Sequence, residues 1–137
     1  MNEGNSFFDT NVLLYLLSSD VSKASRAEEA LVPGGVISVQ VLNEFTSVAS
    51  RKFAMSLKEV REVLDVVRSV CAIESLTIAT YDRGLEVAER YGFSVFDSMI
   101  IASALIADCP LLLSEDLQHG QMIEGRLRVI NPFVTNT

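Results

Sequence analysis

Short apolar runs alternate with longer segments of helical periodicity along the whole chain, and this alternation limits the possible folds more than any other feature. The short runs, which we expect to form strands, are residues 6–9, 36–38, 71–73, 111–114 and 127–130. Short strands joined by helices imply a parallel sheet that is covered on both faces. The sequence therefore predicts an α/β fold with a short central parallel sheet of four to five strands, flanked by helices on both faces.

The segments between the runs carry helix signals. We expect one helix to begin near Asn11 or Val12, and others to cover residues 22–31, 39–52, 77–91 and 99–107. Ser56 is a suitable N-cap for a further helix, and Gly92 is a suitable C-terminal stop. Residues 99–107 are apolar on all sides, which predicts a central buried helix. No linker rich in proline, glycine or serine divides the chain, so we expect a single domain over residues 1–137.

Composition limits the class of protein. The chain is 49% hydrophobic and its net charge is −7, which argues against binding nucleic acid mainly through a large basic surface. No apolar stretch reaches the roughly 20 residues that span a bilayer, and the N-terminus lacks a basic leader, so we expect a soluble cytoplasmic protein. Cys71 and Cys109 sit in apolar surroundings and are interpreted as small core residues in a reducing compartment.

Four acids stand in places where an ionised side chain costs stability. Asp9 follows Phe7-Phe8, and the other three, Glu44, Asp97 and Asp116, also lie in or directly after apolar stretches. Burying a carboxylate is expensive unless a partner compensates the charge, and no basic residue is adjacent in the sequence. Hard divalent cations such as Mg²⁺ or Mn²⁺ prefer oxygen ligands of this kind. A shared cation is the simplest explanation, and it indicates phosphate chemistry.

Each acid also has an ordinary structural interpretation. Asp9 would serve as a helix N-cap, Asp116 fits a turn after a strand, and Ser94 with Asp97 fits a capping box. Glu44 is harder to explain in this way, because it lies on an apolar stripe inside its helix and away from both ends. Taken together, the four acids favour one site at one edge of the sheet.

Other polar residues are candidates for weaker roles. Asn11 and Ser114 stand beside two of the acids and are suited to orienting a carboxylate or a water. Arg51 and Lys52 form the densest basic patch, which is either a solvated helix end or a weak contact with an RNA backbone. His119, the single histidine, is interpreted as a turn or surface residue rather than a catalytic base.

The chain resembles PIN-domain proteins, and within them the VapC-like toxins of type II toxin–antitoxin modules. The resemblance is carried by four segments in family order, followed by an Asn-Pro-Phe ending: residues 7–13, 38–45, 91–100 and 113–120. It implies a PIN-like fold and a Mg²⁺- or Mn²⁺-dependent endoribonuclease with Asp9, Glu44, Asp97 and Asp116 as the acidic site. It also implies a hydroxyl role for Ser114, a small protein antitoxin as partner, and a homodimer.

The expected activity is hydrolysis of RNA phosphodiester bonds by a metal-activated water. Asp116 fits the family register better than its neighbour Glu115, but which of the two approaches the metal stays open from the sequence. Two alternatives stand beside this hypothesis. One is a non-catalytic PIN-fold module that binds RNA or assists assembly. The other is a receiver-like phosphoacceptor domain, which would need a lysine near the last strands, and none follows Lys58.

Overall fold

The computed structural model describes residues 5–134, and at its centre is a six-stranded sheet in the order β3-β2-β1-β4-β6-β5. All neighbouring strands are parallel except β5, which pairs antiparallel with β6. The strands are β1 (Ser6–Phe8), β2 (Gly35–Ser38), β3 (Cys71–Glu74), β4 (Leu111–Leu113), β5 (Met122–Ile123) and β6 (Leu127–Ile130).

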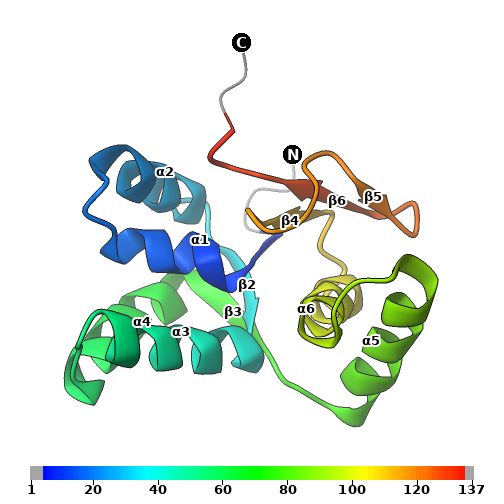
Figure 1. Ribbon diagram of the computed structural model, residues 1–137, viewed down its shortest axis with the longest axis horizontal. Coiled ribbons are helices and arrows are strands. Elements are labelled where there is room, and N and C mark those ends of the chain that lie inside the picture. Colours follow the sequence, from blue (N-terminus) through cyan, green and yellow to red (C-terminus); the bar gives the residue numbers. More distant parts are fainter. Residues whose placement is uncertain (1–4, 135–137) are drawn as a thin grey trace.

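Helices cover both faces of the sheet. Figure 1 shows α1 to α4 on one side of the sheet and α5 with α6 on the other. The helical elements are α1 (Thr10–Leu14), the 3₁₀ helix η1 (Tyr15–Leu17), α2 (Val21–Leu31), α3 (Val39–Lys52), α4 (Leu57–Val70), α5 (Ile78–Tyr91) and α6 (Val95–Ile106). The predicted α/β fold with a central, mostly parallel sheet is therefore confirmed.

Helix ends follow the local signals in the sequence. Ser56 Oγ accepts a hydrogen bond from the Glu59 N–H, and the Glu59 carboxylate accepts one from the Ser56 N–H, which forms a complete capping box at the start of α4. Gly92 ends α5 with a φ of 77°, a left-handed conformation that a residue with a Cβ adopts only at a cost. Both predicted boundaries are confirmed.

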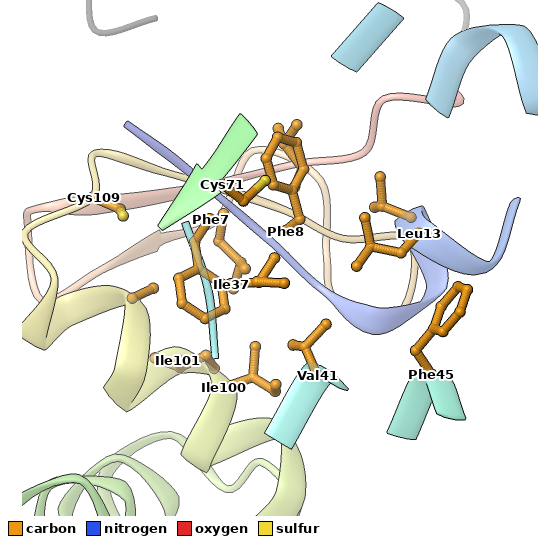
Figure 2. Close-up of a cluster of buried hydrophobic side chains, with 14 of the residues drawn as sticks. Phe7, Phe8, Leu13, Ile37, Val41, Phe45, Cys71, Ile100, Ile101 and Cys109 are labelled. Atoms are coloured by element: carbon orange, nitrogen blue, oxygen red, sulfur yellow. The ribbon is translucent and has the colours of Figure 1, made fainter. Parts of the chain in front are cut away.

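The core lies on both faces of β1. Phe7 and Phe8 are both fully buried, and Figure 2 shows their rings pointing in opposite directions, with Phe7 on the side of Ile101. This alternation is the normal geometry of a strand. On the α6 side, a Cβ placed on Gly84 would lie 2.5 Å from Met99 Sδ, so α5 packs closely on α6 because residue 84 has no side chain.

Two details differ from the sequence-based expectation. α6 begins at Val95, one turn before the predicted start at residue 99, because Ser94 Oγ caps it by accepting the Asp97 N–H. The predicted central position of this helix is confirmed, since Ile101, Ala102, Ser103 and Ala104 are fully buried. The two-residue strand β5 was not predicted; it forms a hairpin with β6 through residues 124–126, of which Glu124 and Gly125 have a positive φ.

Cys71 and Cys109 are free and buried, as expected for small core residues. Within residues 5–134, no helix combines the length and apolar character needed to cross a membrane.

Candidate functional site

Two of the four predicted acids follow neighbouring strands at the same edge of the sheet. β1 and β4 are parallel partners; Asp9 directly follows β1, and Asp116 lies shortly after β4. The Asp9 backbone N–H continues the pairing by donating to the Leu113 carbonyl over 2.9 Å. In open α/β sheets, ligands bind beyond the carboxyl ends of the strands, and this edge is the corresponding place here.

All four acids line a single cleft at this edge, with a volume of about 140 Å³. Two come from the strand ends, Glu44 comes from α3, and Asp97 comes from the first turn of α6. The complete lining is Asp9, Thr10, Asn11, Leu14, Gln40, Glu44, Val48, Phe96, Asp97, Ile100 and Asp116. The fold thus brings together side chains that are up to 107 residues apart in sequence numbering.

Asp9 is the most buried of the four acids, with only 6% of its surface exposed. Its Oδ1 accepts the Thr10 N–H at 2.7 Å, and its Oδ2 accepts the Ser114 hydroxyl at 2.8 Å. Burial raises the pKa of the Asp9 carboxyl from 3.8 to about 6; the two hydrogen bonds oppose this shift, and the charges of Asp116 and Asp97 add to it. Asp9 does cap α1, but capping alone leaves its charge poorly compensated.

Thr10 joins Asp9 to Glu44, and sequence reasoning did not identify it. Besides its N–H bond to Asp9, its hydroxyl donates to Glu44 Oε1 over 2.8 Å. Thr10 is itself 7% exposed, and the part-buried bond from its hydroxyl holds the Glu44 carboxylate in one orientation at the wall of the cleft. A threonine directly after a buried aspartate at the start of a helix was the available signal.

Ser114 and Asn11 connect Asp9 to Asp116. The Ser114 hydroxyl donates to Asp9 and its oxygen accepts the Asp116 N–H at 3.2 Å, while Asn11 Nδ2 donates to Asp116 Oδ2 at 2.5 Å. Partial burial raises the pKa of Asp116, with further contributions from the charges of Asp97 and Glu115. The two residues expected to orient a carboxylate are therefore hydrogen-bonded to carboxylates, although a catalytic role for them stays a prediction.

Asp97 is the acid for which a capping box offered the strongest alternative. Only half of that motif is formed: Ser94 Oγ accepts the Asp97 N–H at 3.1 Å. Within residues 5–134, no hydrogen bond or ion pair holds the Asp97 carboxylate itself, unlike the reciprocal boxes that begin α4 and α5. The backbone N–H of Asp97 thus takes part in the N-cap of α6, and the side chain of Asp97 lines the cleft with a carboxylate that is unbonded within the described residues.

Glu115 is held away from the four acids. Its Oε1 accepts the Tyr15 hydroxyl at 2.5 Å, and its Oε2 lies 3.4 Å from Lys23 Nζ. It lines a neighbouring cleft with Tyr15 and Lys52, whereas Asp116 lines the cleft of the acids. This geometry favours Asp116 over Glu115 as the member of the acidic set.

The weaker candidates lie outside the acidic cleft. Lys52 lines the neighbouring cleft, which shares Asn11, Leu14 and Val48 with the acidic one. Arg51 is exposed on the same helix and lines neither cleft. His119 is exposed, and its Nδ1 accepts the Asn131 N–H at 2.9 Å, which agrees with the expectation of a structural turn histidine.

The acidic cleft suits a hard, partly hydrated cation better than a dehydrated one. Every charged side chain that lines the cleft is a carboxylate. The pKa of the Asp9 carboxyl is raised to about 6, and a nearby cation would stabilise this group as the anion. Across residues 5–134, no three His, Cys, Asp or Glu side chains form a ready-made chelate. Mg²⁺ typically keeps several waters and takes only one or two carboxylates directly, and a cleft of this volume holds several waters.

Comparison with known proteins gives one family match. The family model described as "PIN domain" matches residues 6–122. No curated protein matches the chain at a significant level.

Solved structures with the same fold come from several bacteria. A toxin–antitoxin complex from Klebsiella pneumoniae is 21% identical, with a TM-score of 0.72 over 94% of this chain and 98% of that chain. VapC20 from Mycobacterium tuberculosis, described as a sarcin-ricin loop cleaving toxin, is 16% identical, with a TM-score of 0.66 over 82% and 90%. FitAcB from Neisseria gonorrhoeae is 15% identical, with a TM-score of 0.62 over 93% and 98%.

Proposed function

The chain belongs to the PIN-domain family, and from that premise we propose that it is a metal-dependent endoribonuclease. The reaction is hydrolysis of RNA phosphodiester bonds in the cleft of Asp9, Glu44, Asp97 and Asp116, with Mg²⁺ or Mn²⁺ as the cofactor. We propose further that the protein is the toxin of a toxin–antitoxin pair.

One observation carries the proposal: a carboxylate that is 6% exposed shares a cleft with three more acids. A set of acids with a purely structural role would cost stability, because like charges in a partly buried cleft repel one another. Such a set is useful when a cation is bound among its members. When bound, Mg²⁺ or Mn²⁺ supplies charge neutralisation at the phosphate and activation of the attacking water.

The residues of the chain prepare the cleft for this chemistry. Asp9, Asp97 and Asp116 are the proposed ligands, and Glu44 is proposed to hold a water or the metal from the α3 side. Thr10 and Ser114 fix the orientations of Glu44 and Asp9 by hydrogen bonds of 2.8 Å each. Fixed carboxylates lose little entropy when the cation and substrate arrive, which is how preorganised electrostatics assist catalysis.

The activity is tested by sequencing RNA 5′ ends after brief expression of the protein in bacteria. Wild type should create discrete new ends that are absent when Asp97→Asn is expressed at the same level. The position and sequence around those ends would identify the RNA target. If wild type and variant give the same ends, the protein is not a nuclease that uses this cleft, and the non-catalytic PIN-fold module becomes the better account.

The partner proposal rests on structural likeness. Two of the similar structures are described as a toxin–antitoxin complex and as a toxin, so we propose that this chain also binds a small protein antitoxin and forms a homodimer. Co-expression with a short open reading frame adjacent to the gene tests the antitoxin proposal, because the two products should co-purify and the neighbouring product should restore growth. Sedimentation of the purified chain tests the homodimer. Growth arrest that persists despite expression of the neighbouring product would contradict this pairing.

A prediction concerns Thr10, whose hydroxyl orients Glu44. Thr10→Val keeps the shape and the backbone N–H bond to Asp9 but removes the donor to Glu44. We expect RNA cleavage to slow by about 10- to 100-fold, the usual effect of removing a group that orients a metal-binding side chain. Single-turnover cleavage measures the effect. Thr46→Val is the matched control, because its hydroxyl donates to the Leu42 carbonyl away from the cleft; equal rates for both variants would show that Thr10 does not position Glu44.

A further inference from the structure

Phe96 is unusual among the side chains that line the acidic cleft. It is 69% exposed, although it is a large aromatic residue directly before Asp97. Among the lining residues within the described part of the chain, it is the one aromatic side chain. The ring of Phe96 is therefore both exposed and part of the wall of the acidic cleft, where a molecule that occupies the cleft can contact it.

The geometry of α6 explains why Phe96 stays uncovered. It lies one helical turn before Ile100, which is 2% exposed, so the two side chains share a face of the helix. This face of α6 is buried in the core at Ile100, and one turn earlier, at Phe96, the same face is exposed. The Phe96 carbonyl accepts a hydrogen bond from Gln40 Nε2 at 3.2 Å, which ties the first turn of α6 to α3 across the cleft.

The lining of the cleft combines two kinds of group. Besides the four acids it includes apolar side chains from three helices: Leu14, Val48, Phe96 and Ile100. A cation among the acids would attract a phosphate, and the ring of Phe96 offers a flat apolar surface in the same cleft. A nucleotide has both a phosphate and a flat aromatic base, and in a single strand that base is free to leave its neighbours.

We propose that Phe96 forms a base-stacking subsite, on which an unpaired nucleobase next to the cleaved phosphate packs. The proposal rests on the ribonuclease function proposed above and names the form of substrate that the site accepts, single-stranded RNA. The net charge of −7 strengthens it, because an acidic protein gains little affinity from general attraction to the phosphate backbone. Stacking supplies affinity without positive charge and is tolerant of sequence, since every base has a flat face.

The subsite is tested by binding, in a background that does not cleave. Asp9→Asn protein is titrated into a fluorescein-labelled ten-nucleotide single-stranded RNA that contains 2-aminopurine, with and without Phe96→Ala or Phe96→Trp. Phe96→Ala should weaken binding by about tenfold or more, the effect expected for losing one stacked base. It should also reduce the change in 2-aminopurine fluorescence that accompanies binding of the parent. Phe96→Trp should bind within about twofold of the parent, because its ring stacks at least as well.

Two controls separate stacking from general effects. Tyr81→Ala removes an aromatic side chain that is 49% exposed on α5 and does not line the cleft, and it should leave RNA affinity unchanged. Phe96→Ala should melt within about 2 °C of its parent, since truncating an exposed side chain rarely alters stability. Sedimentation of each variant reports whether Phe96 instead joins two copies of the chain.

The outcomes are distinct from those for nuclease activity. A parent that does not bind the oligonucleotide, or a Phe96→Ala variant that binds as tightly as the parent, overturns the subsite even if wild type cleaves RNA. Unchanged affinity together with a shift from dimer to monomer would identify Phe96 as a contact between copies and also overturn the subsite. Binding that depends on Phe96 in a protein whose wild type cuts no RNA would uphold the subsite and contradict the nuclease.

Discussion

Asp97→Asn should lower the rate of Mg²⁺-dependent RNA cleavage by at least about a thousandfold while the fold stays intact. The Asp97 carboxylate has no hydrogen-bonding partner within residues 5–134, so the change removes charge from the cleft and breaks no structural contact. Losing a ligand to the cation removes several kcal/mol of stabilisation from the transition state, and about 1.4 kcal/mol corresponds to a factor of ten in rate. Single-turnover cleavage of a labelled RNA measures the loss.

The control for this prediction is Asp82→Asn. Asp82 is exposed on α5, outside the cleft, and the substitution changes the net charge of the protein by the same amount. The Asp82→Asn protein should cleave RNA at the wild-type rate. An Asp97→Asn protein that cleaves as fast as Asp82→Asn would remove Asp97 from the site.

Asp9→Asn should stabilise the protein in the absence of divalent cations, by on the order of 2–3 kcal/mol at pH 7. Burial raises the pKa of Asp9 from 3.8 to about 6. Between these values the folded chain holds more protons than the unfolded chain, so its stability falls as the pH rises through this window. Asparagine does not ionise, and its amide can replace the contacts with Thr10 and Ser114. The variant therefore avoids a penalty that wild type carries at neutral pH.

Thermal melting in EDTA checks this prediction. The melting temperature of Asp9→Asn should exceed that of wild type by roughly 10 °C at pH 7, and the free-energy difference should fall to about half at pH 5, where Asp9 is mostly protonated. Adding Mn²⁺ should narrow the gap, because a cation that binds only the folded wild type stabilises it. If Asp9→Asn melts at or below the wild-type temperature at pH 7, the carboxylate is not a source of strain in the folded protein.

The sheet and most helices could be predicted because their signals are local. Apolar runs of strand length, the Ser56 cap and the Gly92 stop each lie within a few residues of the boundary that they determine. The strand β5 was missed because two residues carry no periodicity, and its pairing with β6 depends on the turn at Gly125. The start of α6 was placed late because its first turn is not part of the apolar core: Val95 is 51% exposed and Phe96 is 69% exposed.

The four acids could be predicted individually, but the hydrogen bonds that hold their side chains could not. A carboxylate in an apolar run is visible in the sequence, and so is the apolar stripe that carries Glu44. The hydrogen bond from Thr10 to Glu44 joins residues 34 positions apart, and the bond from Ser114 to Asp9 joins residues 105 apart. Such pairings depend on which helices and strands become neighbours. Gln40 was within reach of sequence reasoning, since it precedes Glu44 by one helical turn and therefore lines the same cleft.

The capping interpretation of Asp97 shows how a correct local rule can give an incomplete answer. Ser94 does cap α6 and the Asp97 N–H is its partner, so the pattern was read correctly for the backbone. The carboxylate does not return the bond, and it lines the acidic cleft. The sequence motif cannot tell whether the Asp97 carboxylate bonds back to the Ser94 N–H or points into the cleft, because that choice depends on the surroundings of the side chain in the folded protein.

The measurement that tests the central claim most directly is Mn²⁺ binding at pH 7, read from the electron paramagnetic resonance signal of the free ion. We predict that wild type and Asp82→Asn bind one or two ions per chain, and that Asp97→Asn binds at least about tenfold more weakly. Wild-type protein that binds no Mn²⁺ at millimolar concentration, or that binds it with the same affinity as Asp97→Asn, would contradict a cation site formed by the four acids.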